Sequence, residues 1–183
     1  MLTTSHFQQL RSFYPDWDNL CRLAAEQHRP LYLVGGAIRD LLRGCQLHEL
    51  DFACPAADLP AWEKIFLTSR PAGRFISLGR DEFFVRRLVG GGPTLDLAVL
   101  SEDDLNLDLG RRDFTINAMA WDLSADRGYD PFGGAADLKA RIISCVKARN
   151  LADDPLRVLR AVRFAGVLEA RIDNSCLEAM RAA

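Results

Sequence analysis

Two acidic residues, Glu49 and Asp51, lie two positions apart in a short apolar run that closely follows a glycine pair, Gly35 and Gly36. Residues two apart in an extended chain project from the same face of a strand, so both carboxylates face one way. The glycines lie where an apolar run passes into a helical pattern, so backbone N–H groups and the positive end of the helix dipole can face an anion such as a triphosphate. Carboxylates beside such a turn indicate Mg²⁺ and nucleotide chemistry. The alternatives are solvated surface charge and a simple tight turn.

The apolar pattern around these residues predicts a mixture of strands and helices. Apolar runs bounded by glycine or proline indicate strands, and apolar residues at spacings of three and four indicate helices. The expected strands are residues 31–34, 49–53, 74–78, 83–89 and 94–100, and the expected helices are residues 16–27, 37–42 and 59–69. The last three strands would extend the sheet that the first two begin.

A third acid, Asp96, interrupts the last of these strands between two leucines. An acid inside an apolar strand faces either solvent or a polar site. An acidic segment at residues 101–110 follows, expected to be a loop that ends in a helix start. Residues 111–121 then show apolar positions at helical spacing, and on such a helix Asp113 and Asn117, four apart, share one face. Helix capping and anchoring in the core is the other interpretation of this pair.

The C-terminal part of the chain is predicted to contain a helix from the Asp153-Asp154-Pro155 sequence to about residue 170, with Asp154 at its cap position and proline in its first turn. Asp154 and Arg157 are three apart and share a face, where they offer an acceptor and a fork of donors to the edge of a base. Asp154 could instead only cap the helix. Arginine recurs at Arg157, Arg160 and Arg163, and this basic stripe is either a solvated face or a contact for phosphates.

Composition and charge exclude several classes of protein. The chain has 183 residues, is 49% hydrophobic and 26% charged, and carries a net charge of −2. Its length fits one sizeable domain with the beginning of a second, and its near-neutral balance argues against a nucleic-acid coat or a polybasic membrane binder. No apolar stretch approaches the ~20 residues of a membrane span, and no signal-peptide pattern is present, so a cytoplasmic protein is expected. Five scattered cysteines and three histidines favour reduced thiols over disulfides or a zinc site.

Five motifs occur in the following order along the chain: Gly35-Gly36-Ala37-Ile38-Arg39-Asp40, Glu49-x-Asp51, Arg111-Arg112-Asp113-Phe114-Thr115-Ile116-Asn117-Ala118-Met119-Ala120, Asp130-Pro131-Phe132-Gly133-Gly134 and Asp153-Asp154-Pro155-Leu156-Arg157. This order resembles the tRNA nucleotidyltransferase and bacterial poly(A) polymerase family, which contains the CCA-adding enzymes. The resemblance covers about residues 30–170. It implies an α+β fold: a polymerase-β-like nucleotidyltransferase head with a small mixed sheet backed by helices, followed by the start of a helical neck. In these terms residues 1–29 are an N-terminal helical arm, residues 30–146 the head and residues 147–183 the start of the neck.

The resemblance also implies an activity. A tRNA 3′-hydroxyl would attack the α-phosphorus of CTP or ATP with pyrophosphate leaving, so that the enzyme adds CCA, CC or A without a template. A poly(A) polymerase is the alternative enzyme, and a catalytically degenerate module that binds NTP or RNA is the alternative of another class. Mg²⁺ is the implied cofactor, because phosphoryl transfer depends on positioning and on charge stabilisation. The sequence does not specify an oligomeric state.

Carried over position by position, the resemblance assigns a role to each candidate residue. Glu49 and Asp51 match the metal-binding pair, and Asp96 matches the third catalytic carboxylate. The remaining candidates match nucleotide-binding positions: Gly35, Gly36 and Arg39 for phosphates, Arg112, Asp113 and Asn117 for the nucleotide and its ribose, Asp154 and Arg157 for the base, and Arg160 and Arg163 for triphosphate or RNA phosphates.

The chain departs from the family pattern in three places. Glu49 stands where the family has aspartate, and one extra methylene moves the carboxylate by on the order of 1 Å, which matters for a metal that needs near-ideal octahedral geometry. Ser101 stands where family members often have arginine. The helical body and tail of the family are absent from the 183 residues, which predicts either a fragment of a longer protein or a stand-alone degenerate homologue.

Overall fold

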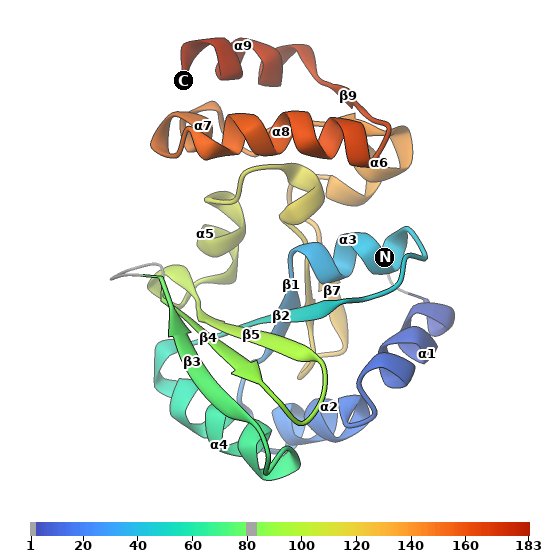
Figure 1. Cartoon of the computed structure of the whole chain (residues 1–183), viewed down its shortest axis with the longest axis vertical. Coiled ribbons are helices and arrows are strands. Elements are labelled where there is room, and N and C mark those ends of the chain that lie inside the picture. The colour runs from blue at the N-terminus through green and yellow to red at the C-terminus, as the bar shows by residue number, and fades with distance from the viewer. Residues whose placement is uncertain (1–2, 80–83) are drawn as a thin grey trace. The chain divides into compact units, whose positions relative to one another are not determined.

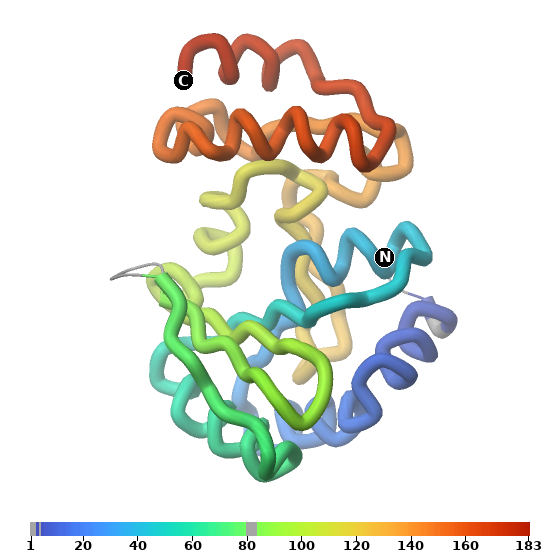
Figure 2. The backbone as a smooth tube through the Cα atoms, viewed as in Figure 1, coloured from blue at the N-terminus to red at the C-terminus, as the bar shows by residue number. Residues whose placement is uncertain are grey.

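The computed structural model describes residues 3–79 and 84–183, and within them the chain forms two compact units (Figure 1). The first unit comprises Met1–Leu105 and Ala120–Tyr129, and the second comprises Asn106–Met119 and Asp130–Ala183. The chain therefore passes between the units at three points, after residues 105, 119 and 129 (Figure 2). No helix within the described residues is long and apolar enough to span a membrane.

The first unit is built on a seven-stranded mixed sheet with the order β3-β4-β5-β2-β1-β6-β7. Only β2 and β5 pair in parallel, and every other neighbouring pair is antiparallel. The strands are β1 (Tyr32–Val34), β2 (Glu49–Cys54), β3 (Arg74–Leu78), β4 (Val85–Val89), β5 (Thr94–Val99), β6 (Ala120–Asp122) and β7 (Arg127–Tyr129). The predicted mixed sheet is confirmed, and the first five strands lie close to their expected positions. Phe83, the expected start of the fourth, lies outside the described residues.

Helices cover the apolar face of this sheet. They are α1 (Thr4–Phe13), α2 (Trp17–Glu26), α3 (Gly36–Leu42) and α4 (Leu59–Ser69), while α5 (Leu105–Gly110) leads into the second unit. Phe52 of β2 packs against Trp17 of α2 and Phe66 of α4, with ring centroids 6.4 and 5.5 Å away. Fully burying a side chain of this size stabilises the fold by about 1.5–3 kcal/mol. Because side chains alternate along a strand, fixing Phe52 in the core turns Glu49 and Asp51 to the opposite face.

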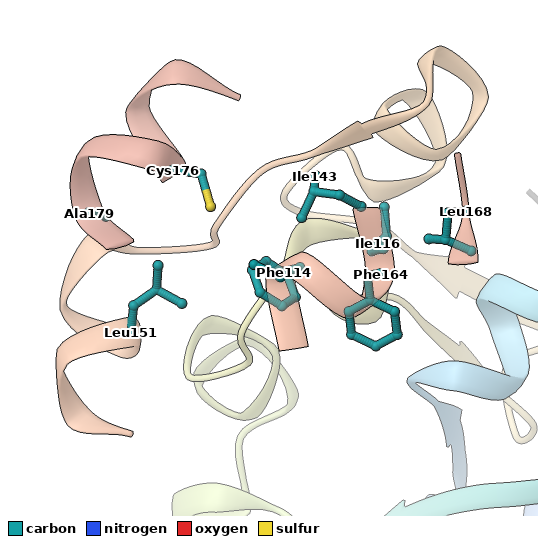
Figure 3. Packing of buried hydrophobic residues seen from close by; sticks show 9 residues of the cluster. Phe114, Ile116, Ile143, Leu151, Phe164, Leu168, Cys176 and Ala179 are labelled. Atoms are coloured by element: carbon teal, nitrogen blue, oxygen red, sulfur yellow. The ribbon is translucent and has the colours of Figure 1, made fainter. Parts of the chain in front are cut away.

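The second unit packs short helices around its own core. Its elements are α6 (Gly134–Ala140), β8 (Ile142–Ile143), α7 (Ala148–Asp153), α8 (Leu156–Val167), β9 (Arg171–Ile172) and α9 (Asn174–Ala182), with β8 and β9 paired in parallel. Figure 3 shows the apolar cluster that these elements enclose, with Phe114, Ile143, Phe164 and Cys176 among its members. Gly134, the first residue of α6, is part of this packing, because a Cβ on it would lie 2.1 Å from the Thr115 carbonyl oxygen.

The predicted helix over residues 111–121 is wrong. The structure has a 3-10 helix at Thr115–Asn117, then β6. The reason is that part of the backbone here bonds to residues 144–146: the Thr115 amide donates to the Ser144 carbonyl, and the Asp113 carbonyl accepts from the Val146 amide. The residues from 113 to 120 are all buried, so their apolar spacing reflects packing on every side and not a helical stripe.

Two boundaries also differ from the expectation. The acidic segment at residues 101–110, expected to be a loop that ends in a helix start, forms a 3-10 helix at Ser101–Asp103 and then α5 from Leu105. The last predicted helix, α8, begins after Pro155 and ends at Val167 instead of about residue 170. It ends early because Glu169 has a positive φ of 49° and the following residues pair with β8 as strand β9.

Candidate functional site

The first unit brings three of the candidate carboxylates onto one face of the sheet. The parallel register of β2 and β5 places Asp51 beside Asp96 and Glu49 beside Thr94. Directly paired residues of neighbouring strands project from the same face, where their side chains can interact. Asp96 in turn lies beside Arg87 of β4. Asp51, Asp96 and Arg87 thus form a row across three adjacent strands, with Glu49 two positions along β2; we call these four residues the carboxylate row.

Arg87 is the residue of this row that sequence reasoning missed. Its Nε and Nη2 atoms each donate to one Asp96 oxygen at 2.7 Å, and Nη2 lies 3.6 Å from Glu49 Oε2. The bidentate hydrogen bond with Asp96 raises the pKa of Arg87, and the charges of Asp96, Glu49 and Asp51 add to this effect although partial burial opposes it. Asp96 therefore faces a polar site, one of the two outcomes expected for an acid in an apolar strand.

The glycine turn borders the carboxylate row. Gly35 has φ 69° and ψ −132°, a conformation that glycine adopts without steric cost, and Gly36 is the first residue of α3. A Cβ on Gly36 would lie 3.4 Å from Arg39 Nη2 and 3.8 Å from Asp51 Oδ2. The bare glycine therefore leaves space beside a guanidinium and a carboxylate. Arg39 also donates through Nε and Nη2 to Asp40, at 2.9 and 3.0 Å.

A buried acid, Asp108, orients the candidate nucleotide-binding residue Arg112 in the second unit. Asp108 of α5, whose side chain is only 5% exposed, lies 2.8 Å from Arg111 Nη2 and 3.0 Å from Arg112 Nη2. Arg112 also donates to the Asn117 carbonyl at 3.3 Å. Sequence reasoning placed Asp108 only in an acidic loop, although its spacing of three and four residues from the two arginines is a signal that could have found it.

Asp113 and Asn117 meet even though the predicted helix is absent. Asn117 Nδ2 donates to Asp113 Oδ1 at 3.1 Å, and the Phe114 amide donates to the same oxygen at 2.8 Å. Arg160 Nη2 lies 2.8 Å from the other oxygen, Oδ2. Asp113 is buried, so the arginine compensates a carboxylate that is removed from water. Two of the expected nucleotide-binding positions thus contact each other, and a third, Arg160, holds them from α8.

The expected base-reading pair lies at the start of α8. Asp154 Oδ1 accepts from the Leu156 amide at 3.0 Å, so its side chain binds the first turn, while Pro155 occupies the cap position expected for Asp154. Arg157 Nη1 donates to the carbonyls of Arg111 and Asn150, at 2.8 and 3.0 Å. Arg157 Nε lies 3.7 Å from Asp154 Oδ2.

The three arginines of the basic stripe on α8 have different surroundings. Arg157 is fixed by carbonyl oxygens and Arg160 by Asp113, whereas the exposed Arg163 lies over the Phe164 ring, 4.7 Å from its centroid. Arg160 is also exposed and lies over the same ring at 5.8 Å, so its ion pair with the buried Asp113 is what distinguishes it.

Comparison with known proteins adds an independent observation. The Poly A polymerase head domain family matches residues 85–144. The CC-adding tRNA nucleotidyltransferase of Synechocystis sp. is 38% identical over 151 residues, covering 81% of this chain and 36% of that protein. The A-adding tRNA nucleotidyltransferase of Deinococcus radiodurans is 38% identical over 149 residues, covering 81% and 33%. The solved structure of the Thermotoga maritima CCA-adding enzyme complexed with tRNA matches with a TM-score of 0.79 and 33% identity, covering 91% of this chain and 40% of that one.

These relatives are longer proteins, and the chain spans about a third of the length of the curated relatives it matches. The match confirms the resemblance carried by the five motifs, and the mixed sheet with its helical cover is the fold that the resemblance implied. The chain belongs to the tRNA nucleotidyltransferase and poly(A) polymerase family, of which it carries the head domain.

Proposed function

We propose that the chain is the catalytic head of a tRNA nucleotidyltransferase, which transfers CMP or AMP from CTP or ATP to a tRNA 3′ end. The observation that carries this proposal is the carboxylate row beside Gly36, where Asp51 and Asp96 are direct neighbours on the sheet face opposite Phe52. The relatives' names, CC-adding and A-adding tRNA nucleotidyltransferase, support tRNA as the acceptor and CTP or ATP as donors. Such an activity belongs in the cytoplasm.

Nucleotidyltransferases generally use a divalent metal ion, and we propose Mg²⁺ here. Mg²⁺ is usually bound by one or two carboxylates together with water and substrate phosphates, and Glu49 and Asp51 supply two carboxylates on one strand face. Among residues 3–79 and 84–183 no group of three or more His, Cys, Asp or Glu side chains is arranged to hold a metal ion. The two-carboxylate set fits a metal whose remaining ligands come from the triphosphate and water. The ion would neutralise charge on the transferring phosphoryl group.

The other residues of the first unit would bind the triphosphate. The glycine turn places backbone next to Arg39 and Asp51, and Gly35 and Gly36 carry no side chain that would obstruct an approaching phosphate. Arg39 would supply a positive charge to the same anion. Asp96 would take the proton from the attacking hydroxyl or help to hold the metal, both of which require a carboxylate on this face.

The second unit would bind the nucleoside. Arg112 is oriented by Asp108, and a fixed guanidinium loses little freedom when it binds a phosphate. The paired Asp113 and Asn117 would contact the ribose hydroxyls. Asp154 and Arg157 offer an acceptor and donors to a cytosine or adenine edge, and the two carbonyls that hold Arg157 Nη1 fix its plane in advance. Arg160 and Arg163 would add positive charge for triphosphate or RNA phosphates.

Nucleotide incorporation tests the proposal. The protein is incubated with Mg²⁺, labelled CTP or ATP, and tRNA transcripts that lack CCA or that end in C or CC; Asp51→Asn is the inactive reference. Incorporation by wild type that Asp51→Asn abolishes is the expected result. Extension of an unrelated RNA by many adenylates would instead identify a poly(A) polymerase. If wild type is inert but Glu49→Asp is active, the chain is a degenerate member. If NTP binding is independent of metal, the assignment of Glu49 and Asp51 is wrong.

A further inference from the structure

Arg87 occupies the position in the carboxylate row where a cation is needed, although it belongs to none of the five motifs. Its guanidinium holds Asp96 through two hydrogen bonds of 2.7 Å and lies 3.6 Å from a Glu49 oxygen. A bidentate arginine–carboxylate pair is the stronger form of this interaction. One side chain therefore contacts two carboxylates that come from two different strands.

The carboxylates need this cation when no metal is bound. Asp51 and Asp96 are direct neighbours in the β2–β5 ladder, and like charges placed opposite each other destabilise a sheet. Arg87 is the next residue in the same row and provides the opposite charge. Its elevated pKa has the same origin, namely the hydrogen bond with Asp96 and the charges of the three acids.

A divalent ion and Arg87 would compete for the same carboxylate oxygens of the row. Both oxygens of Asp96 already accept from the guanidinium, and a second cation at Glu49 would lie close to a positive charge 3.6 Å from that carboxylate. We infer that Arg87 is a tethered counter-ion of the carboxylate row, which stabilises the metal-free head and competes with the divalent ion for Asp96 and Glu49. This inference rests on the proposed function, because the metal is assigned there.

In this role Arg87 is a positioning residue. It keeps Asp96 and Glu49 in place before the metal arrives and lowers the affinity for metal alone. Metal then binds best together with a triphosphate, because the added negative charge offsets Arg87. A residue that only stabilised the strand would affect folding and leave metal affinity unchanged, so metal affinity is the readout that separates the two roles.

The neighbouring arginine provides a matched control. Arg86 lies on the same strand but its side chain leaves the opposite face, where it pairs with Glu63 and donates to Ser77. Arg86→Gln removes the same charge from the same strand without touching the row. Arg87→Lys keeps a cation in the row but cannot form the bidentate hydrogen bond. It is the variant to measure if Arg87→Gln folds poorly.

The experiment measures Mn²⁺ binding to the nucleotide-free protein by electron paramagnetic resonance, and thermal unfolding in EDTA and in Mn²⁺. Arg87→Gln should bind Mn²⁺ about 5- to 20-fold more tightly than wild type, because one nearby positive charge is removed. It should unfold at a lower temperature in EDTA and gain more from Mn²⁺. Arg86→Gln should match the wild-type affinity, and Arg87→Lys should lie within about threefold of it.

Three results would overturn the inference, and the first of them leaves the proposed function intact. If Arg87→Gln and wild type bind Mn²⁺ equally, or the variant binds more weakly, Arg87 does not compete with metal, and the proposed function stands. If neither protein binds Mn²⁺ while both remain folded, the metal assignment of the proposed function fails and the inference fails with it. Binding that survives Asp51→Asn would show that the ion occupies another place, which also contradicts both.

Discussion

The carboxylate row of the first unit and the arginines Arg111, Arg112, Arg157 and Arg160 of the second, which we call the arginine cluster, present opposite charges. The row gathers three acids on a sheet face around one guanidinium, that of Arg87. In the second unit each buried acid serves arginines: Asp108 holds two, and Asp113 holds Arg160. The first region therefore has negative charge to offer to cations, and the second has guanidinium groups to offer to anions.

The two regions also differ in how their charged side chains are held in position. In the first unit a strand register aligns the acids, so the positions are set by a backbone ladder. In the second unit the arginines are oriented one at a time, by a nearly buried carboxylate or by carbonyl oxygens such as those of Arg111 and Asn150. We expect replacement of a single acid in the row to change metal binding with little effect on folding, and replacement of a buried acid in the second unit to change nucleotide binding and folding together.

The largest expected effect is on catalysis in the row. Asp51→Asn removes a charged metal ligand but keeps the shape of the side chain, so nucleotide incorporation should fall by at least about 1,000-fold, the scale on which electrostatic stabilisation acts. The unfolding midpoint should change little. Asp18→Asn, at an exposed acid of α2 paired with Arg11, is the control and should keep wild-type activity. Single-turnover incorporation at saturating Mg²⁺ measures both, and an active Asp51→Asn would remove the row from the mechanism.

The next largest effect is a loss of stability caused by a steric clash in the second unit. Gly134→Ala places a Cβ 2.1 Å from the Thr115 carbonyl oxygen and 3.1 Å from Met119 Cγ, so the backbone must move. We expect a loss of about 2–4 kcal/mol in the free energy of unfolding, the range of severe packing defects.

Gly166→Ala in α8 is the matched control for Gly134→Ala. Apart from its chain neighbours and the nearby backbone of α8, no atom of the described residues lies within 4 Å of its Cβ position, and alanine in a helix should stabilise by about 0.5–1 kcal/mol. Urea titrations followed by tryptophan fluorescence and circular dichroism compare the two variants. Equal stabilities would mean that the close approach at Thr115 does not limit the fold.

The sequence predicted the elements whose local signals agree with their environment. In β2, apolar residues alternate with Glu49 and Asp51, and the core contact of Phe52 keeps that alternation. Local signals were misleading where burial is complete: the residues around Ile116 have helical spacing, but the Asp113 carbonyl and the Thr115 amide bond to Val146 and Ser144. Spacing along the chain cannot reveal a partner that lies thirty residues away.

The candidate site shows the same limit. Arg87 could not be chosen over Arg86 from the sequence, because a slip of one residue in strand register exchanges the two faces. The register of β4 with β5 puts Arg87 beside Asp96 and turns Arg86 to Glu63. Arginine at that position became a candidate only when both neighbouring strands were placed.

A smaller effect is expected where Asp108 orients the arginines. Asp108→Asn removes the charge between Arg111 and Arg112 and replaces one of the two acceptor oxygens by an NH₂ group, so one guanidinium group loses its acceptor. We expect nucleotide KM to rise about 10-fold, with a stability loss of about 1–3 kcal/mol, the cost of disturbing a buried hydrogen-bonded charge. Mn²⁺ affinity, a property of the row, should stay within about twofold of wild type. Glu102→Gln, on the neighbouring acidic segment, is the control. A change in metal affinity as large as that in KM would show that the two regions do not act separately.

The smallest expected effect concerns Arg163, an exposed arginine of the α8 stripe that lies over the Phe164 ring. Arg163→Gln should weaken tRNA binding about two- to fivefold and reduce the slope of log affinity against log salt by about one, as expected for one lost phosphate contact. Arg160→Gln differs because its guanidinium compensates the buried Asp113, so it should also lower the unfolding midpoint. Fluorescence anisotropy with labelled tRNA at several salt concentrations separates the two variants. If Arg163→Gln leaves the salt slope unchanged, its charge is only a solvated face, and the anion-binding surface of the second unit ends at Arg160.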